Sequence, residues 1–283
     1  MEITVAEQKV FLVEARLSPE QAKERAWDQK MAAFGSFSRL LLRPKGDEIK
    51  VATAEKRFEP LWFAAARRRI VFDRGREYRV PVGDQTVQRV TVAGSDYPVA
   101  PGPPRHYIIR GVEHCEDDVR VESFIDGVTG ADVAAAAIAA APHEEIVELA
   151  DFAPSDAIVV PPEVKASTVV QRLVQRLMTT YEADQVFEES ITVEHLQLLY
   201  HPVYAFEYVW EARGKKAVVE IDAVTGEVRT DGRAFHQQMR RIFNREVLFD
   251  LGAETVNLVV PGGAIALKIG KAIVDHQRGP KRT

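Results

Sequence analysis

A proline-containing phrase that occurs twice places the strongest constraint on how this chain can fold. The stretch AEKRFEPLWFAAARRR covers residues 54–69, and LQLLYHPVYAFEYVWE covers residues 196–211. Pro60 and Pro202 are 142 residues apart, close to half the chain length. Aromatic residues flank both prolines, and they too are 142 positions apart: Phe58 matches Tyr200, and Trp62 matches Tyr204. This recurrence predicts an internal duplication.

A helix pattern precedes each phrase at nearly the same spacing. Residues 18–34 open with a serine cap, a proline at the first helical position and a glutamine placed for a capping box. Residues 161–181 are also entered through proline, and Pro162 lies 143 residues after Pro19. Stretches rich in β-branched residues follow both helices. The sequence therefore predicts an α+β fold of two related domains, each a helix packed on an antiparallel sheet, plus C-terminal helices.

A turn phrase helps to divide the chain. IDGVTG at residues 125–130 and IDAVTG at residues 221–226 are only 96 residues apart, so the first repeat is expected to carry an insertion of about 46 residues. Loop 83–107 is its simplest place. The predicted parts are a first repeat with this loop over 1–135, a connector over 136–160, a second repeat over 161–231 and a helical extension over 232–283.

Structural roles are expected for the prolines and for the turn. Proline cannot donate to a sheet ladder, so Pro60 and Pro202 are predicted at an edge, a bulge or a strand start. There they would bend the strand and turn Trp62 and Tyr204 into the core, although a binding motif is the alternative. In the second turn, Asp222 is expected to accept backbone N–H groups, and Gly226 to take a positive φ.

The second half resembles the PepSY-type modules. The resemblance rests on a helix followed by strands that end in YVWEARGKKAVVEIDAVTGEV, with a lysine-rich turn and an Asp-x-x-Thr-Gly hairpin. It covers residues 160–228, and more loosely residues 18–130. It implies a small helix-on-sheet unit in each region. Members of this family are mostly extracytoplasmic regulators or inhibitors.

Composition and the termini predict a cytoplasmic protein. A net charge of −5 gives no global field that would select nucleic acid or an anionic membrane. Cys115 is the single cysteine, which excludes an internal disulfide and suits a reducing compartment. The N-terminal segment lacks a basic region followed by an apolar run. The apolar run at 256–267 has 12 residues, too few for a membrane span of about 20.

Catalytic and metal-binding motifs are not recognisable in the sequence. His106, His114 and Cys115 could supply zinc ligands, but their spacing is not that of structural zinc sites. Three acids follow Cys115 and would raise the pKa of a nucleophilic thiol. His195 and His201 flank a strand and are expected to be exposed rather than paired. We therefore expect no metal, no cofactor and no defined catalytic residue.

The most distinctive polar segment is RRRIVFDRGREYR at residues 67–79. Six arginines against two acids give this predicted hairpin a local charge of +4. The arginines are Arg67, Arg68, Arg69, Arg74, Arg76 and Arg79. One interpretation is a solvated edge strand that its charges protect from aggregation. The other is a binding surface for an anionic partner such as RNA, DNA or an acidic protein, with aromatic residues available for stacking.

The C-terminal segment 262–277 is expected to be a short apolar helix that needs a partner. The apolar residues proposed for docking are Ile265, Leu267, Ile269 and Ile273. Docking on another chain is favoured slightly over burial in the protein's own core.

Together these features predict a non-enzymatic cytoplasmic adaptor or scaffold that binds another protein or itself. The alternatives are a nucleic-acid-binding protein that uses the arginine-rich hairpin, and a hydrolase whose residues converge from distant segments.

Overall fold

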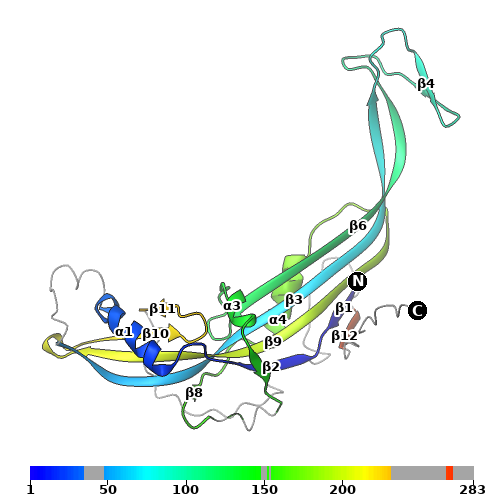
Figure 1. The fold of residues 1–283 in the computed structure, drawn as a ribbon. Coiled ribbons are helices and arrows are strands. Elements are labelled where there is room, and N and C mark those ends of the chain that lie inside the picture. The colour runs from blue at the N-terminus through cyan, green and yellow to red at the C-terminus, as the bar shows by residue number, and fades with distance from the viewer. Residues whose placement is uncertain (35–47, 148–151, 153, 231–265, 270–283) are drawn as a thin grey trace, which may run out of the picture.

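The computed structural model describes residues 1–34, 48–147, 152 and 154–230, together with the backbone of 266–269. These residues are mostly strand, and ten strands form one mixed sheet (Figure 1). Its strands are β1 (Glu2–Val5), β2 (Gln8–Val13), β3 (Ile49–Pro81), β6 (His106–Asp126), β7 (His143–Glu145), β8 (Ile158–Val159), β9 (Gln185–Trp210), β10 (Lys215–Asp222), β11 (Val228–Arg229) and β12 (Ala266–Ile269). The described α-helices are α1 (Pro19–Ala33), α3 (Ala136–Ala139) and α4 (Ala166–Leu177). A separate small hairpin consists of β4 (Arg89–Val92) and β5 (Ser95–Pro98).

Two long antiparallel strands form the centre of the sheet. Their pairing runs from Ile49 of β3 opposite Trp210 of β9 to Asp73 opposite Gln185. Strand β6 continues the sheet beyond β3, and β10 continues it beyond β9, in both cases antiparallel. Strands β1 and β2 add to β9 in parallel. The sheet is therefore mixed and is shared by the two halves of the chain.

The predicted fold class of two related α+β domains is wrong. A strand from the first half pairs along most of its length with a strand from the second half, so the halves do not form separate sheets. The helices also cross over, because α1 packs on β9 and β10 while α4 packs on β3 and β6. Sequence periodicity indicates where strands lie, but it does not specify which strands pair across a long separation. The boundaries predicted at residues 135, 160 and 231 stay predictions.

The two prolines lie in the central strands rather than at an edge. Pro60 stands opposite Tyr200, and Pro202 stands opposite Phe58. On the side of β3 that faces away from β9, the neighbouring strand changes. Strand β8 is the neighbour up to Phe58, and β6 is the neighbour from Leu61 onward. On the side of β9 that faces away from β3, β2 is the neighbour up to Tyr200, and β10 is the neighbour from Val203 onward. Each proline therefore occupies the point at which its strand changes neighbours, where the lost N–H interrupts no ladder.

The aromatic residues beside the prolines are buried, as the sequence predicts. Trp62 packs in the core beneath α4, and its Nε1 donates to the carbonyl oxygen of Val164 at 2.9 Å. Tyr204 packs with Tyr208 and Trp210 against α1. A third core lies around Leu61 and Leu199 and is covered by α3. Phe58 and Tyr200 are buried as well.

The two Asp-x-x-Thr-Gly turns have the expected geometry. Asp222 Oδ1 accepts the N–H groups of Val224 and Thr225 at 2.9 and 2.8 Å, and Gly226 has φ +78°. The turn at Asp126 makes the same pair of bonds, at 2.9 and 2.7 Å. Each turn also receives an arginine from a helix: Arg25 of α1 donates to the Gly226 carbonyl, and Arg172 of α4 to the Gly130 carbonyl. The capping box at Ser18 and Gln21 is also present.

The prediction of C-terminal helices disagrees with the part of this region that the structure describes. Residues 266–269 form a strand, in which Leu267 and Ile269 stand beside Ile3 and Val5 of β1 in parallel. The expectation of a helix is therefore wrong at these four residues, and their backbone is bound by this chain. Ile265, Ile273 and the rest of the helical extension predicted over 232–283 lie outside the described residues. Within the described part of the chain, no helix is both long and apolar enough to span a membrane.

Candidate interaction arm

A two-stranded arm extends from the sheet. Beyond Asp73, β3 loses its partner β9 and pairs only with β6, down to Pro81 opposite His106. We call residues 74–81 and 106–113 the arm. Figure 1 shows it projecting from the body of the sheet, with β4 and β5 beyond its end. An isolated two-stranded ribbon is marginally stable in water, so side-chain contacts have to support it.

Ion pairs across the strands hold the base of the arm. Arg67 donates to Asp118 at 2.6 Å, and this contact lowers the pKa of that carboxyl group. Arg69 lies 2.8 Å from Glu116 and also contacts Glu188 of β9. The positive segment at 67–79 thus faces carboxylates on the neighbouring strands. The local charge of +4 read from one strand is largely balanced within the sheet.

Arg68 differs from its two neighbours because it is buried. Only 3% of the residue is exposed. Its guanidinium donates to the Leu177 carbonyl at the end of α4 and to Thr179, both at 2.5 Å. It also lies 2.5 Å from Asp117. The contact of Arg68 with an anionic partner, proposed from the sequence, is thus blocked by its burial, and Arg68 instead ties α4 to the sheet.

The remaining arginines of the segment lie on the arm itself. Arg74 donates to Glu113 at 2.5 Å, and Arg76 lies 3.2 Å from Glu182. The Arg79 side chain is exposed and has no hydrogen-bond or ion-pair partner among the residues that the structure describes. It is therefore the one arginine of the six whose charge is not matched there. Nucleic-acid binding by this segment stays a prediction, and the pairing favours the interpretation of a protected strand.

One face of the arm is stabilised by a tyrosine that covers a glycine. The Tyr78 ring lies where a Cβ on Gly111 would make contact at 3.4 Å. The Tyr78 hydroxyl donates to Glu113 at 2.7 Å. This hydrogen bond raises the pKa of Tyr78, and the same bond, together with Arg74, lowers the pKa of Glu113. This face therefore has a role in holding the ribbon together.

The opposite face of the arm exposes apolar side chains. Residues of β6 alternate between the faces, and Ile108 and Val112 lie on the same one. Val112 is 60% exposed and Ile108 is 36% exposed. Arg110 lies between them and is paired with Glu77 at 2.9 Å. We call this surface the Ile108–Val112 face. Sequence analysis missed it, although a usable signal was present: in HYIIRGV, apolar residues fall at both odd and even positions, so both faces of a strand would carry them.

A shallow hollow adjoins the same face at the end of the arm. Its lining consists of Arg79, Pro81, His106 and the loop residues Pro101, Gly102, Pro103 and Pro104. His106 Nδ1 is 3.1 Å from the Pro104 carbonyl. The histidine candidates for a metal site have separate partners, since His114 lies 2.7 Å from Asp73. No group of potential metal ligands occurs among the described residues.

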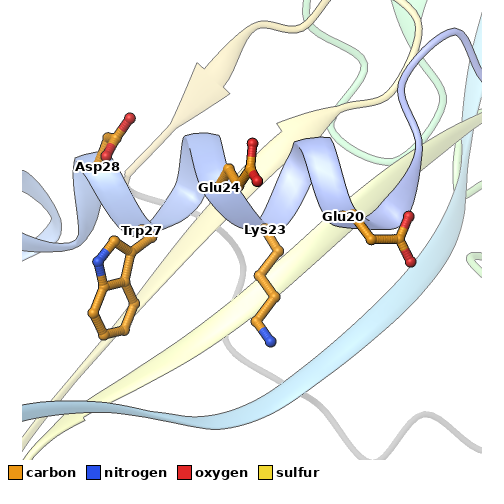
Figure 2. A pocket seen from close by; sticks show the side chains of 5 residues that line it. All are labelled: Glu20, Lys23, Glu24, Trp27 and Asp28. Atoms are coloured by element: carbon orange, nitrogen blue, oxygen red, sulfur yellow. The ribbon is translucent and has the colours of Figure 1, made fainter.

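A second hollow lies along α1, far from the arm. Figure 2 shows Trp27 and Lys23 projecting from one side of the helix, while Glu24 and Asp28 point the other way. Lys30 places its Nζ 3.0 Å from the centre of the Trp27 ring, which is a close cation–π contact. Trp27 is thereby engaged with its own helix, although it remains partly exposed.

Charged residues are also buried within the sheet. Arg57 lies 2.9 Å from Glu220, and Arg229 lies 3.0 Å from Glu59. His201 Nδ1 lies 2.8 Å from Asp222 Oδ2, at ion-pair distance but poorly aligned for a hydrogen bond. The expectation that His201 would be exposed is wrong, since the residue is buried.

His195 is exposed, as expected, and its ring stacks on Phe63. The buried pairs join β3, β9, β10 and β11, and the two arginine pairs among them are hydrogen-bonded. They are therefore better explained as a structural network than as a catalytic site.

Comparison with known proteins adds no identification: no family model, no curated protein and no solved structure matches this chain.

Proposed function

We propose that this protein is a non-enzymatic cytoplasmic adaptor that binds a partner protein through the Ile108–Val112 face of its arm. The observation that carries the proposal is a ribbon that leaves the sheet and holds exposed apolar side chains on one face. Large exposed apolar side chains that cluster on a projecting element are typical of interaction surfaces. The single Cys115 supports a reducing compartment.

The electrostatic features of the arm support a protein partner over a nucleic acid. Nucleic-acid surfaces depend on several cations that are free to meet phosphates. Here Arg67, Arg69, Arg74 and Arg76 all have carboxylate partners on neighbouring strands or loops. On the Ile108–Val112 face the arginine between the two apolar residues is also paired, so the face combines exposed apolar side chains with matched charges, which suits a protein partner better than a polyanion.

Site-specific photocrosslinking tests the proposal. A benzophenone amino acid replaces Val112 in the full chain, and the matched control carries it at Glu24 on the exposed side of α1. We expect the Val112 position to yield a discrete product with another protein in the source cells, and Ile108→Asp in the same chain to abolish it. The same products from both positions, or none from Val112, contradict the proposal. A product that contains only this chain identifies self-association and overturns the adaptor function.

A further inference from the structure

The hollow at the end of the arm combines apolar walls with an unmatched cation. Its proline rings provide rigid apolar surface, and Arg79 lies at its border. Ile108 stands directly opposite Arg79 in the ladder, so the hollow is continuous with the Ile108–Val112 face. A ligand on this face therefore meets apolar side chains and, at one end, a guanidinium group.

Hydrogen bonds hold the two chain segments that adjoin the hollow. Arg105 donates to the carbonyl oxygens of Asp84, Gln85 and Val87, with the last of these bonds at 2.7 Å. The backbone N–H of Val82 donates to the Arg105 carbonyl at 2.8 Å. A preformed site loses little conformational entropy when a ligand binds. Arg105 is thus used to build the loop, which leaves Arg79 as the cation available to a ligand.

We propose that Arg79 and the proline-lined hollow bind a carboxylate side chain of an acidic, extended segment of the partner protein. A guanidinium matches a carboxylate in shape and can donate two parallel hydrogen bonds to it. A peptide carboxylate fits better than a polyanion, because Arg79 is the one cation of the arginine-rich segment left unmatched among the described residues, whereas a polyanion requires several free cations. This inference rests on the proposed adaptor function and names the chemistry of its partner.

Fluorescence anisotropy of the full-length protein tests the site. The probe is a fluorescein-labelled ten-residue peptide of alternating glutamate and serine, compared with its glutamine–serine counterpart at low salt. Arg79→Gln is the test variant. Arg89→Gln is the matched control, since Arg89 is an exposed arginine of the small hairpin, outside the Ile108–Val112 face and the hollow, and is paired with Asp96. We expect Arg79→Gln to weaken binding of the glutamate peptide roughly fivefold, and Arg89→Gln to change it little.

Three results would overturn the carboxylate site. These are no binding of the glutamate peptide at low salt, equal binding of the glutamine peptide, and equal losses in the two variants. A ten-nucleotide oligothymidine that binds more tightly than the peptide, with the same dependence on Arg79, would also overturn it in favour of a phosphate ligand. Crosslinking at Val112 separates the two proposals, because a crosslink formed by a protein with intact Arg79 that does not bind the glutamate peptide overturns the carboxylate site alone.

Discussion

The backbone N–H of Gly127 donates to the carbonyl oxygen of Pro60 at 2.8 Å. This contact brings the turn after β6 so close to β3 that a Cβ on Gly127 would lie 2.8 Å from that oxygen and from the Pro60 Cβ. Non-bonded atoms do not approach so closely, so residue 127 has to lack a side chain.

Replacing Gly127 is therefore expected to destabilise the fold. Gly127→Ala forces the turn away from Pro60, at a cost of about 1–3 kcal/mol in the free energy of unfolding. Urea denaturation of the purified protein measures it. Gly83→Ala is the control, because a Cβ there meets nothing within 4 Å. Equal stability of the two variants would show that the turn yields easily.

Trp62 is expected to be a major source of core stability. Trp62→Ala removes a fully buried side chain and is expected to cost about 3–5 kcal/mol. Trp62→Phe keeps part of the packing but removes the donor to the Val164 carbonyl, so we expect a smaller loss. Chemical unfolding curves measure both. A loss below about 1 kcal/mol in Trp62→Ala contradicts the packing described above.

Substituting two adjacent arginines, Arg67 and Arg68, is expected to change the free energy of unfolding by very different amounts. Arg68→Ala empties a buried position and leaves the Leu177 carbonyl without this donor, which is expected to cost about 2–4 kcal/mol. Arg67→Ala removes an exposed ion pair and is expected to have a much smaller effect. Thermal and urea unfolding of the two variants give the comparison. Similar losses would indicate that the burial of Arg68 contributes little.

Acid stability is expected to depend on Asp222. Burial alone would raise the pKa of this carboxyl group, but His201 and the two turn N–H groups lower it to about 2. Because the folded-state pKa is below the unfolded value of 3.8, the stabilisation is complete above about pH 4 and is lost as pH falls towards 2. Asp222→Asn is therefore expected to lose about 2 kcal/mol at pH 7 and to approach wild type near pH 2. Unfolding curves of wild type and Asp222→Asn, measured across this pH range, test the prediction. A difference in stability between the two proteins that does not change with pH contradicts it.

Local structure could be predicted from the sequence where one short segment determines it. The helix that begins at Pro19 and the turn at Asp222 both depend on neighbouring residues, and both agree with the structure. The strand at 266–269 was expected as a helix because, at helical spacing, Lys268, Lys271 and Asp275 share one face and apolar residues occupy the others. Pairing with β1 decides its conformation, and this partner lies at the other end of the chain. The resemblance to PepSY-type modules stays a prediction.

The other incorrect predictions concern residues whose partners come from strands far away in the sequence. Residues 67–79 were expected to form a charged hairpin, but they lie within the single strand β3, and the acids that pair with its arginines come from β6 and β9. A charge count over one segment cannot include these acids. His201 was expected to be exposed for the same reason, since Asp222 reaches it from β10. Arg79 could be singled out only once the partners of the other arginines were known.

The pairing of β3 with β9 also sets an order of events during synthesis. Strand β3 ends at Pro81, whereas β9 is complete only at Trp210. At a translation rate of about 5–20 residues per second, the later strand follows the earlier one by roughly 6–26 s. During that delay β6 can protect one edge of β3, while the edge intended for β9 stays open. A nascent chain of this protein is therefore vulnerable to aggregation along that edge, and slow passage through residues 82–210 would prolong the exposure.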